Sequence, residues 1–361
     1  MSLPPTSIPA NSSCEAIQEC QNNANSTACS LDNKGWTVMI TVYILIVAVL
    51  GIMFNLFVVM VFCLHKKACT VPEIYLSNLA AADFILSSFL PFWAVYTANK
   101  FSWPFGSTMC QIAALCIVMN AYCSIYFLVL VSIDRYLALV HPLSHERMRR
   151  PKYAKLACLL VWALGLLPGV PVLMYRKVEY NPCTNKYICF IAYPSTKIEL
   201  LSEAMLITFS FIIPIFIISF CTFKIIRALN HRLNAQNTEH KATTLVLAVL
   251  LSFLVCWVPF HLVKIIEMLL IAKVLEGCDL CRHIEAAKLI VIYLAFFNSV
   301  LNPILYVIVG KKFRKKVKEV FKQWSAGRTS TLSLNSVRSY LSRSDKSGDV
   351  SGRSARQQSF K

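Results

Sequence analysis

The chain has 361 residues, of which 57% are hydrophobic and only 15% are charged, and its mean hydropathy is +0.57. A soluble domain of ordinary composition carries about 25% charged residues, so the composition excludes a soluble globular protein. The net charge of +18 could suit a nucleic-acid-binding protein, but no nucleic-acid partner is expected because the basic residues flank long apolar segments.

In chain order, seven apolar segments are each long enough to cross the hydrocarbon core of a bilayer as a helix. They cover residues 37–64, 72–98, 107–140, 153–175, 200–230, 237–271 and 284–309. The sequence therefore predicts an all-α membrane protein, with a seven-transmembrane helix bundle over 37–310. Residues 1–36 are polar, and they show no basic stretch followed by an apolar one, so we expect an N-terminal segment without a cleavable signal peptide.

The distribution of charge predicts the orientation of the chain. If the N-terminus is extracellular, the outer segments hold basic and acidic residues in balance, and the whole net charge lies on the inner side. An excess of Lys and Arg in inner segments is typical of membrane proteins. We therefore expect a multi-pass plasma-membrane protein with its C-terminus in the cytoplasm. The glycosylation sequons at Asn11 and Asn25 agree with this orientation.

The cysteines that this topology places outside are even in number, which suits disulfides in an oxidising compartment. They are Cys14, Cys20, Cys29, Cys110, Cys183, Cys189, Cys278 and Cys281.

After the seventh span, residues 311–324 predict a short amphipathic helix. Its apolar stripe consists of Phe313, Val317, Val320, Phe321 and Trp324. Because Lys and Arg cover the remaining faces, we expect this helix to lie on the lipids of the anionic inner leaflet. Residues 325–361 lack a periodic apolar pattern and predict a disordered cytoplasmic tail. No cysteine follows Cys281, so no lipid anchor is expected there.

Several polar side chains interrupt the predicted spans, where polar groups are costly. They are Asn55, Asp83, Asn120, Ser124, Asn298, Ser299 and Asn302. One interpretation is that they join the helices by hydrogen bonds. The other is a hydrated cavity that holds a sodium ion, with Asp83 at its centre. The residues alone favour the first interpretation slightly.

Short motifs occur in order, one in each expected helix. They are Asn55, Leu79-Ala-Ala-Ala-Asp83, Cys110 with Asp134-Arg135-Tyr136, Trp162, Pro214, Cys256-Trp257-Val258-Pro259 and Asn302-Pro303-Ile304-Leu305-Tyr306. In this order the chain resembles the rhodopsin-like (class A) G protein-coupled receptors over residues 37–324. The resemblance implies a heterotrimeric G protein as partner, with no enzymatic activity and no cofactor other than an allosteric sodium ion.

The resemblance also implies roles for individual residues. The sodium and activation residues are Asp83, Asn120, Ser124, Asn298, Asn302 and Tyr306, with Asp83 as the charged metal ligand. The switch facing the G protein consists of Asp134, Arg135, Tyr136 and Glu239. The tail residues Thr329, Ser330, Thr331, Ser333 and Ser336 would accept phosphates from receptor kinases and then bind arrestin. A passive tail is the alternative.

Two disulfides are implied by the same resemblance. Cys110 would bond to the second outer loop, where Cys189 is the better partner and Cys183 remains a competitor. Cys29 would bond to Cys278 in the loop before the seventh helix. The other outer cysteines leave the connectivity open.

Longer segments resemble the kinin (bradykinin) receptors. They cover residues 61–66, 69–83, 91–94, 131–140 and 307–316. The resemblance implies that Glu267 and Glu285 receive the basic N-terminus of a peptide, although the family usually has Asp at both positions. Val118 stands where the receptor type for the shortened peptide has Lys, which favours the type that binds full-length bradykinin. Trp93, Trp257 and Phe260 are the other expected ligand-binding residues.

The residues argue against three other classes of membrane protein, namely an amine receptor, a transporter and an intramembrane enzyme. The outer half of the third helix has no acid to pair with an amine ligand. A transporter would show repeated halves, which the predicted spans lack. An intramembrane enzyme would need a second acid near Asp83, and the sequence has none there. The nearest alternative is a receptor for another peptide, angiotensin-like or chemokine-like. The family implies signalling mainly through Gq and phospholipase C, which raises intracellular calcium.

Overall fold

The computed structural model describes most of the chain between residues 34 and 325. The described ranges are 34–65, 68–141, 150–182, 185–231, 237–275, 278–308, residue 310 and 313–325. Within them, the side chains of residues 34, 229–246, 278, 279, 281, 282, 285 and 286 are not described.

The described part of the chain is built from long apolar helices. They are α2 (Lys34–Leu64), α3 (Val71–Ala98), α4 (Gly106–Val140), α6 (Pro151–Leu166), α7 (Val170–Tyr175), α8 (Thr196–Ile207), α9 (Ile213–His231), α10 (Asn237–Ile271) and α11 (Cys278–Ile308). Taken with the short turns that join α6 to α7 and α8 to α9, they form seven helices long and apolar enough to cross a membrane. The predicted helix bundle is confirmed.

Two of these spans are irregular near a proline. A 3₁₀ turn (Leu167–Gly169) joins α6 to α7, and a π-helical turn (Thr208–Ile212) joins α8 to α9 just before Pro214. Proline lacks the backbone N–H that a regular α-helix requires, and a turn with different hydrogen bonding accommodates it.

A β-hairpin, which the apolar pattern did not indicate, covers one end of the bundle. Strand β1 (Arg176–Asn181) pairs antiparallel with β2 (Lys186–Ile191), and Val178 stands opposite Cys189. Asn185 has a positive φ of 54° in the turn between the strands, a conformation that Asn tolerates better than most residues. We call this end of the bundle the hairpin end.

The helices approach one another closely where small residues lie between them. A Cβ atom on Gly51 of α2 would lie 2.2 Å from Ser87 Oγ of α3, and one on Gly165 of α6 would lie 2.5 Å from Cys123 Sγ of α4. Small residues at helix contacts are typical of membrane proteins. Large apolar side chains such as Phe216, 74% exposed, face outward, as expected in lipid.

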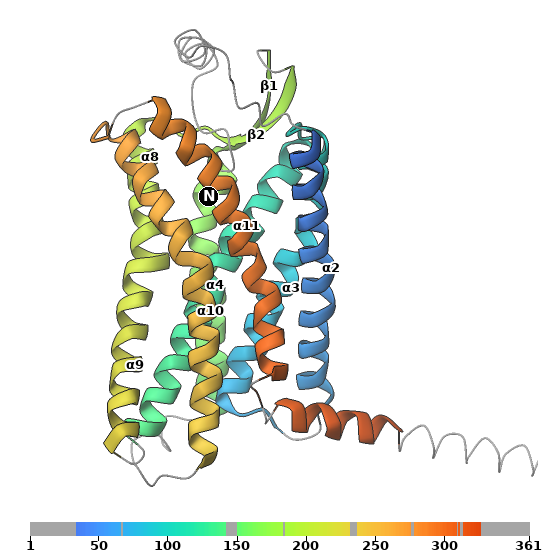
Figure 1. The fold of residues 1–361 in the computed structure, drawn as a ribbon, viewed down its shortest axis with the longest axis vertical. Coiled ribbons are helices and arrows are strands. Elements are labelled where there is room, and N and C mark those ends of the chain that lie inside the picture. Colours follow the sequence, from blue (N-terminus) through green and yellow to red (C-terminus); the bar gives the residue numbers. More distant parts are fainter. Residues whose placement is uncertain are drawn as a thin grey trace, which may run out of the picture.

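A helix over residues 313–325 follows α11 at the other end of the bundle and runs across the direction of the long helices (Figure 1). We call it the surface helix. Phe321 and Trp324 are 56% and 62% exposed, whereas Phe313 is buried. The short amphipathic helix predicted after the seventh span is therefore present.

Candidate functional site

The carboxylate of Asp83 lies fully buried at the centre of a polar network. Asn120 Nδ2 donates to Asp83 Oδ1 at 2.9 Å, and Ser124 Oγ donates to the same oxygen at 3.3 Å. Asn302 Nδ2 donates to Asp83 Oδ2 at 2.8 Å. Because these donors come from α4 and α11, the network joins three helices around the carboxylate of Asp83.

Two further members of the predicted set are buried with unsatisfied oxygens. Asn298 Oδ1 and Tyr306 Oη have no hydrogen-bond partner among the described residues, and neither does Asn302 Oδ1. Buried polar atoms are nearly always paired with protein, water or an ion. The Asp83 network therefore has spare oxygen ligands beside a carboxylate.

Near the C-terminal end of α4, the neighbouring residues Asp134 and Arg135 form an ion pair with each other. Arg135 Nε donates to Asp134 Oδ2 at 3.0 Å, and a second guanidinium nitrogen contacts the same oxygen. The hydroxyl of Tyr136 is 3.0 Å from His141 Nε2. Glu239, the other predicted partner of Arg135, has a side chain outside the described part of the chain.

Trp257 lies in the core two residues before Pro259, which is inside α10. Its ring stacks on Phe253 at 5.7 Å and meets Phe260 edge-on at 5.7 Å. His261 continues the cluster, since its Nε2 is 2.9 Å from Ser210 Oγ at the π-helical turn. A shift of this cluster would change the contact between α10 and the span formed by α8 and α9.

At the hairpin end, a disulfide joins α4 to β2. Cys110 and Cys189 are bonded, with Cα atoms 6.0 Å apart, so the preferred partner of Cys110 is found and Cys183 is excluded from this bond. The other predicted disulfide, Cys29 to Cys278, lies outside the described residues.

Arg176 is a buried cation that the sequence did not indicate. It begins β1, is fully buried, and its Nε lies 3.3 Å from Cys189 Sγ. Its guanidinium also lies 5.8 Å from the centre of the Trp93 ring. Burial lowers the pKa of Arg176 to about 10. The predicted ligand-binding residue Trp93 thus faces a positive charge as well as a small aromatic cavity that Tyr96 and Tyr293 help to line.

Four charged side chains form a buried ion-pair chain between α8, α10 and α11. Lys264 Nζ lies between Glu203 Oε1 at 2.9 Å and Glu267 Oε2 at 2.8 Å. Lys288 Nζ contacts the other oxygen of Glu267 at 2.6 Å. All four residues are at most 7% exposed. We call Glu203, Lys264, Glu267 and Lys288 the charged quartet.

The charged quartet changes the setting of one predicted ligand-binding residue. Glu267 was expected at the mouth of the pocket; on α10 it is buried, and both of its oxygens already contact lysines. Glu203, Lys264 and Lys288 were not predicted. The signal that could have found them is a charge inside an apolar span, which rarely occurs without a function. The side chain of Glu285 is outside the described part of the chain. Val118, on α4, is buried in the core of the bundle.

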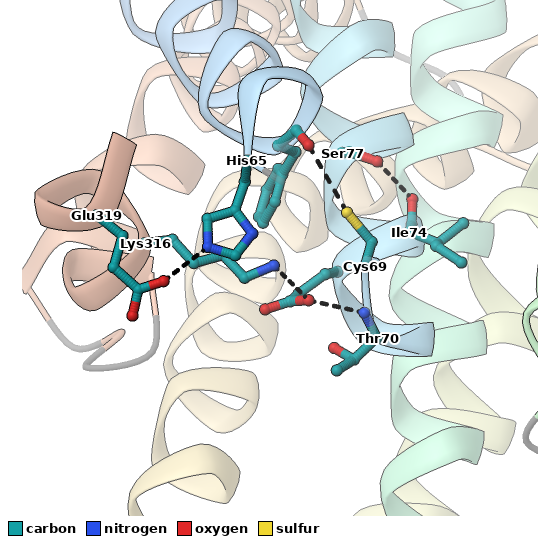
Figure 2. Close-up of polar contacts among 9 residues, drawn as sticks. His65, Cys69, Thr70, Ile74, Ser77, Lys316 and Glu319 are labelled. Atoms are coloured by element: carbon teal, nitrogen blue, oxygen red, sulfur yellow. Dashed lines mark hydrogen bonds and ion pairs between the residues drawn. The ribbon is translucent and has the colours of Figure 1, made fainter. Parts of the chain in front are cut away.

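Contacts between protein groups hold the surface helix against the bundle (Figure 2). Lys316 Nζ donates to Glu73 Oε2 at 2.9 Å, and the backbone N–H of Thr70 donates to the same oxygen at 2.7 Å. His65 Nε2 is 2.9 Å from the carboxylate of Glu319. Two polar contacts therefore fix this helix to α3 and to the end of α2.

The buried ring of Phe313 completes this attachment. It packs against Phe57, Phe62 and Tyr306, with ring centres 5.6–6.4 Å apart. Because Tyr306 ends the Asn-Pro-x-x-Tyr motif of α11, the surface helix is joined directly to a predicted activation residue.

The other predicted positions lie outside the described residues. They are the sequons at Asn11 and Asn25 and the tail residues Thr329, Ser330, Thr331, Ser333 and Ser336.

Comparison with known proteins places the chain in a family. Residues 54–306 match the 7 transmembrane receptor (rhodopsin family). The chain belongs to this family, whose members are receptors rather than enzymes, and it is a multi-pass membrane protein.

Within that family the chain belongs with the bradykinin receptors. It is 42% identical over 322 residues to the B2 bradykinin receptor of Oryctolagus cuniculus, covering 86% of this chain and 88% of the relative. It is 45% identical over 285 residues to the B2 bradykinin receptor of Homo sapiens, covering 77% and 73%. The B1 bradykinin receptor of Macaca mulatta is 35% identical over 308 residues, covering 83% and 88%. The resemblance to the B2 type is therefore the stronger of the two.

Proposed function

We propose that the chain is a plasma-membrane receptor that binds a basic, bradykinin-like peptide at the hairpin end and activates a heterotrimeric G protein at the other end. The observation that carries the proposal is the 42% identity to a B2 bradykinin receptor over 86% of the chain. The buried acids Glu203 and Glu267 support it, because a cationic ligand needs acceptors at the hairpin end.

The remaining parts of the proposal concern the two sides of the membrane. The hairpin end is extracellular, which puts the disulfide between Cys110 and Cys189 in the oxidising compartment. The surface helix lies on the inner leaflet, where the exposed Phe321 and Trp324 contact lipid. Signalling runs through Gq and phospholipase C, and kinases and arrestin act on the tail.

Displacement of a radiolabelled kinin from membranes that contain the full chain tests the ligand. Full-length bradykinin is expected to displace the label more strongly than the peptide shortened at its C-terminal Arg, because no lysine stands at Val118. Angiotensin-like and chemokine-like peptides serve as competitors of other classes. If neither kinin binds at micromolar concentration, the ligand assignment is wrong while the receptor family stands. Peptide-stimulated nucleotide exchange on purified Gq tests the coupling.

Replacing both Glu267 and Glu285 with Gln is expected to weaken binding of a kinin with its N-terminal Arg about 10- to 100-fold, because charge-assisted hydrogen bonds are worth about 1.5–3 kcal/mol. A kinin that lacks this Arg should lose much less. The control is Glu179→Gln, which removes an exposed acid from β1. Equal losses for the two peptides would refute the pairing.

We also propose an allosteric sodium ion beside Asp83. Support comes from the unpaired oxygen of Asn302, whose amide donates to Asp83, and from that of Asn298 one turn earlier in α11, because sodium prefers oxygen ligands. The ion would contribute a positive charge that offsets Asp83, while Asn120 and Ser124 orient the carboxylate.

The Asp83→Asn variant tests this ion through stability rather than signalling. Sodium chloride should raise the unfolding temperature of the ligand-free wild type above its value in potassium chloride of equal ionic strength, by roughly 2–4 °C for each kcal/mol of binding. Asp83→Asn should abolish the difference. A difference that persists in the variant would argue against a site at Asp83.

A further inference from the structure

The carboxylate of Glu203 is held by one oxygen only. Glu203 is 4% exposed on α8, and its Oε1 accepts a hydrogen bond from Lys264 Nζ at 2.9 Å. The second oxygen, Oε2, is buried and has no hydrogen-bond partner among the described residues. An unpaired carboxylate oxygen is costly in an apolar bundle, so a donor is expected to bind there in some functional state.

The other members of the charged quartet hold the Glu203 carboxylate in position, but none of them forms a hydrogen bond with Oε2. Lys264 is shared between Glu203 and Glu267, while Lys288 holds the second oxygen of Glu267 at 2.6 Å. Both oxygens of Glu267 are thus engaged and one oxygen of Glu203 is not. The ion-pair chain fixes the position of the Glu203 carboxylate, and Oε2 is left as the acceptor.

The surroundings of Glu203 place this oxygen under the hairpin end. Tyr193, which follows β2, has its hydroxyl 3.0 Å from that of Ser202, the residue before Glu203 in α8, and burial raises the pKa of Tyr193. Glu203 also interacts electrostatically with Tyr122 of α4. The carboxylate of Glu203 therefore lies where α8 packs against α10, and its neighbour Ser202 contacts the residue that follows the hairpin.

We propose that Glu203 is a second cation-binding position of the peptide pocket, with its Oε2 atom receiving an N–H of a basic side chain of the ligand. Lys264, Glu267 and Lys288 are positioning residues that hold the carboxylate. This inference rests on the proposed peptide-receptor function and adds to it: the preferred ligand carries two separate basic groups, one for the mouth of the pocket and one for Glu203. A charged donor fits best, because hydrogen bonds between ions are about twice as strong as neutral ones.

The experiment couples a receptor substitution to a ligand substitution. Binding is measured on membranes for wild type, Glu203→Gln and the exposed-acid control Glu179→Gln. The ligands are full-length bradykinin and analogues in which each Arg in turn is replaced by citrulline, its neutral isostere. Glu203→Gln should weaken full-length peptide about 10- to 100-fold. It should have little further effect on the one analogue that lacks the partner Arg. Glu179→Gln should leave all affinities unchanged.

A double variant separates contact with the ligand from support of the fold. Glu203→Gln with Lys264→Met removes the acid together with its lysine, and Lys288 remains to pair with Glu267. If Glu203 binds the ligand, the double variant should bind full-length bradykinin as weakly as Glu203→Gln does. Restored affinity in the double variant, or an equal loss for every analogue, would show that Glu203 only supports Lys264 and would overturn the inference.

The same data distinguish failure of the inference from failure of the proposed function. If wild type binds bradykinin and Glu203→Gln does not alter the affinity, the second cation position is wrong and the receptor assignment stands. If wild type binds no kinin, the proposed function fails and the inference falls with it.

Discussion

The Lys264→Met variant is expected to be destabilised by about 3–5 kcal/mol, the usual cost of removing one partner from a buried ion pair. Lys264 is 3% exposed and is the only link between Glu203 and Glu267 within the described charged quartet. Without it, Glu203 loses its ion-pair partner in an apolar environment, and Glu267 keeps Lys288 alone. The unfolding temperature of the purified ligand-free protein in detergent measures the effect.

Two variants make this prediction specific. Lys273→Met removes an exposed lysine just after α10 and should leave the unfolding temperature nearly unchanged, because exposed charges contribute little to stability. Adding Glu203→Gln to Lys264→Met should recover part of the loss, since the stranded carboxylate becomes neutral. If Lys264→Met and Lys273→Met unfold at the same temperature, the charged quartet does not hold α8 against α10.

The helices could be predicted from the sequence because each one is an apolar run of membrane-spanning length. The third predicted span, 107–140, differs from α4 (Gly106–Val140) by one residue. Boundaries were harder to place at α8 and α11, which begin earlier than expected, at Thr196 and Cys278. Their first turns are polar and extend beyond the apolar run, so hydropathy alone does not mark where they begin.

Pairings between helices were predictable only where a motif supplied them. The network around Asp83 belongs to a set of residues that the rhodopsin-like pattern groups together. Lys264 and Lys288 belong to no such pattern, and their pairing with Glu203 and Glu267 depends on how α8, α10 and α11 are rotated about their axes. An apolar run does not fix that rotation, because most of its faces are hydrophobic.

The surface helix shows the same limit at the end of the bundle opposite the hairpin. Its stripe was expected to contact lipid, yet Phe313 is buried among Phe57, Phe62 and Tyr306. The stripe is therefore divided, with its first residue packed in protein and Phe321 and Trp324 exposed. Together with the contact from Lys316 to Glu73, this packing attaches the helix to the bundle.

The variant with Cys110→Ser and Cys189→Ser is expected to lose about 2–5 kcal/mol of stability together with high-affinity peptide binding. The bond closes a segment with a sequence separation of 79 residues, so its removal frees a long part of the unfolded chain. It also ties β2 to the start of α4. Without it, the hairpin is held by its own pairing and by the hydrogen bonds that Trp103 and Gln111 donate to its backbone. Thermal unfolding and radioligand binding measure the two effects.

Removal of a thiol outside the disulfide provides the matched control. Cys63 is free and exposed at the end of α2, so Cys63→Ser should bind and unfold like the wild type. Mild reduction of the wild type should lower affinity at least as much as the double serine variant does, because it breaks the bond between Cys110 and Cys189 together with every other accessible disulfide. Peptide affinity that survives in the serine variant, with a reduced unfolding temperature, would mean that the hairpin stabilises the fold without shaping the pocket. The second cation position at Glu203 would then have to act without a fixed hairpin above it.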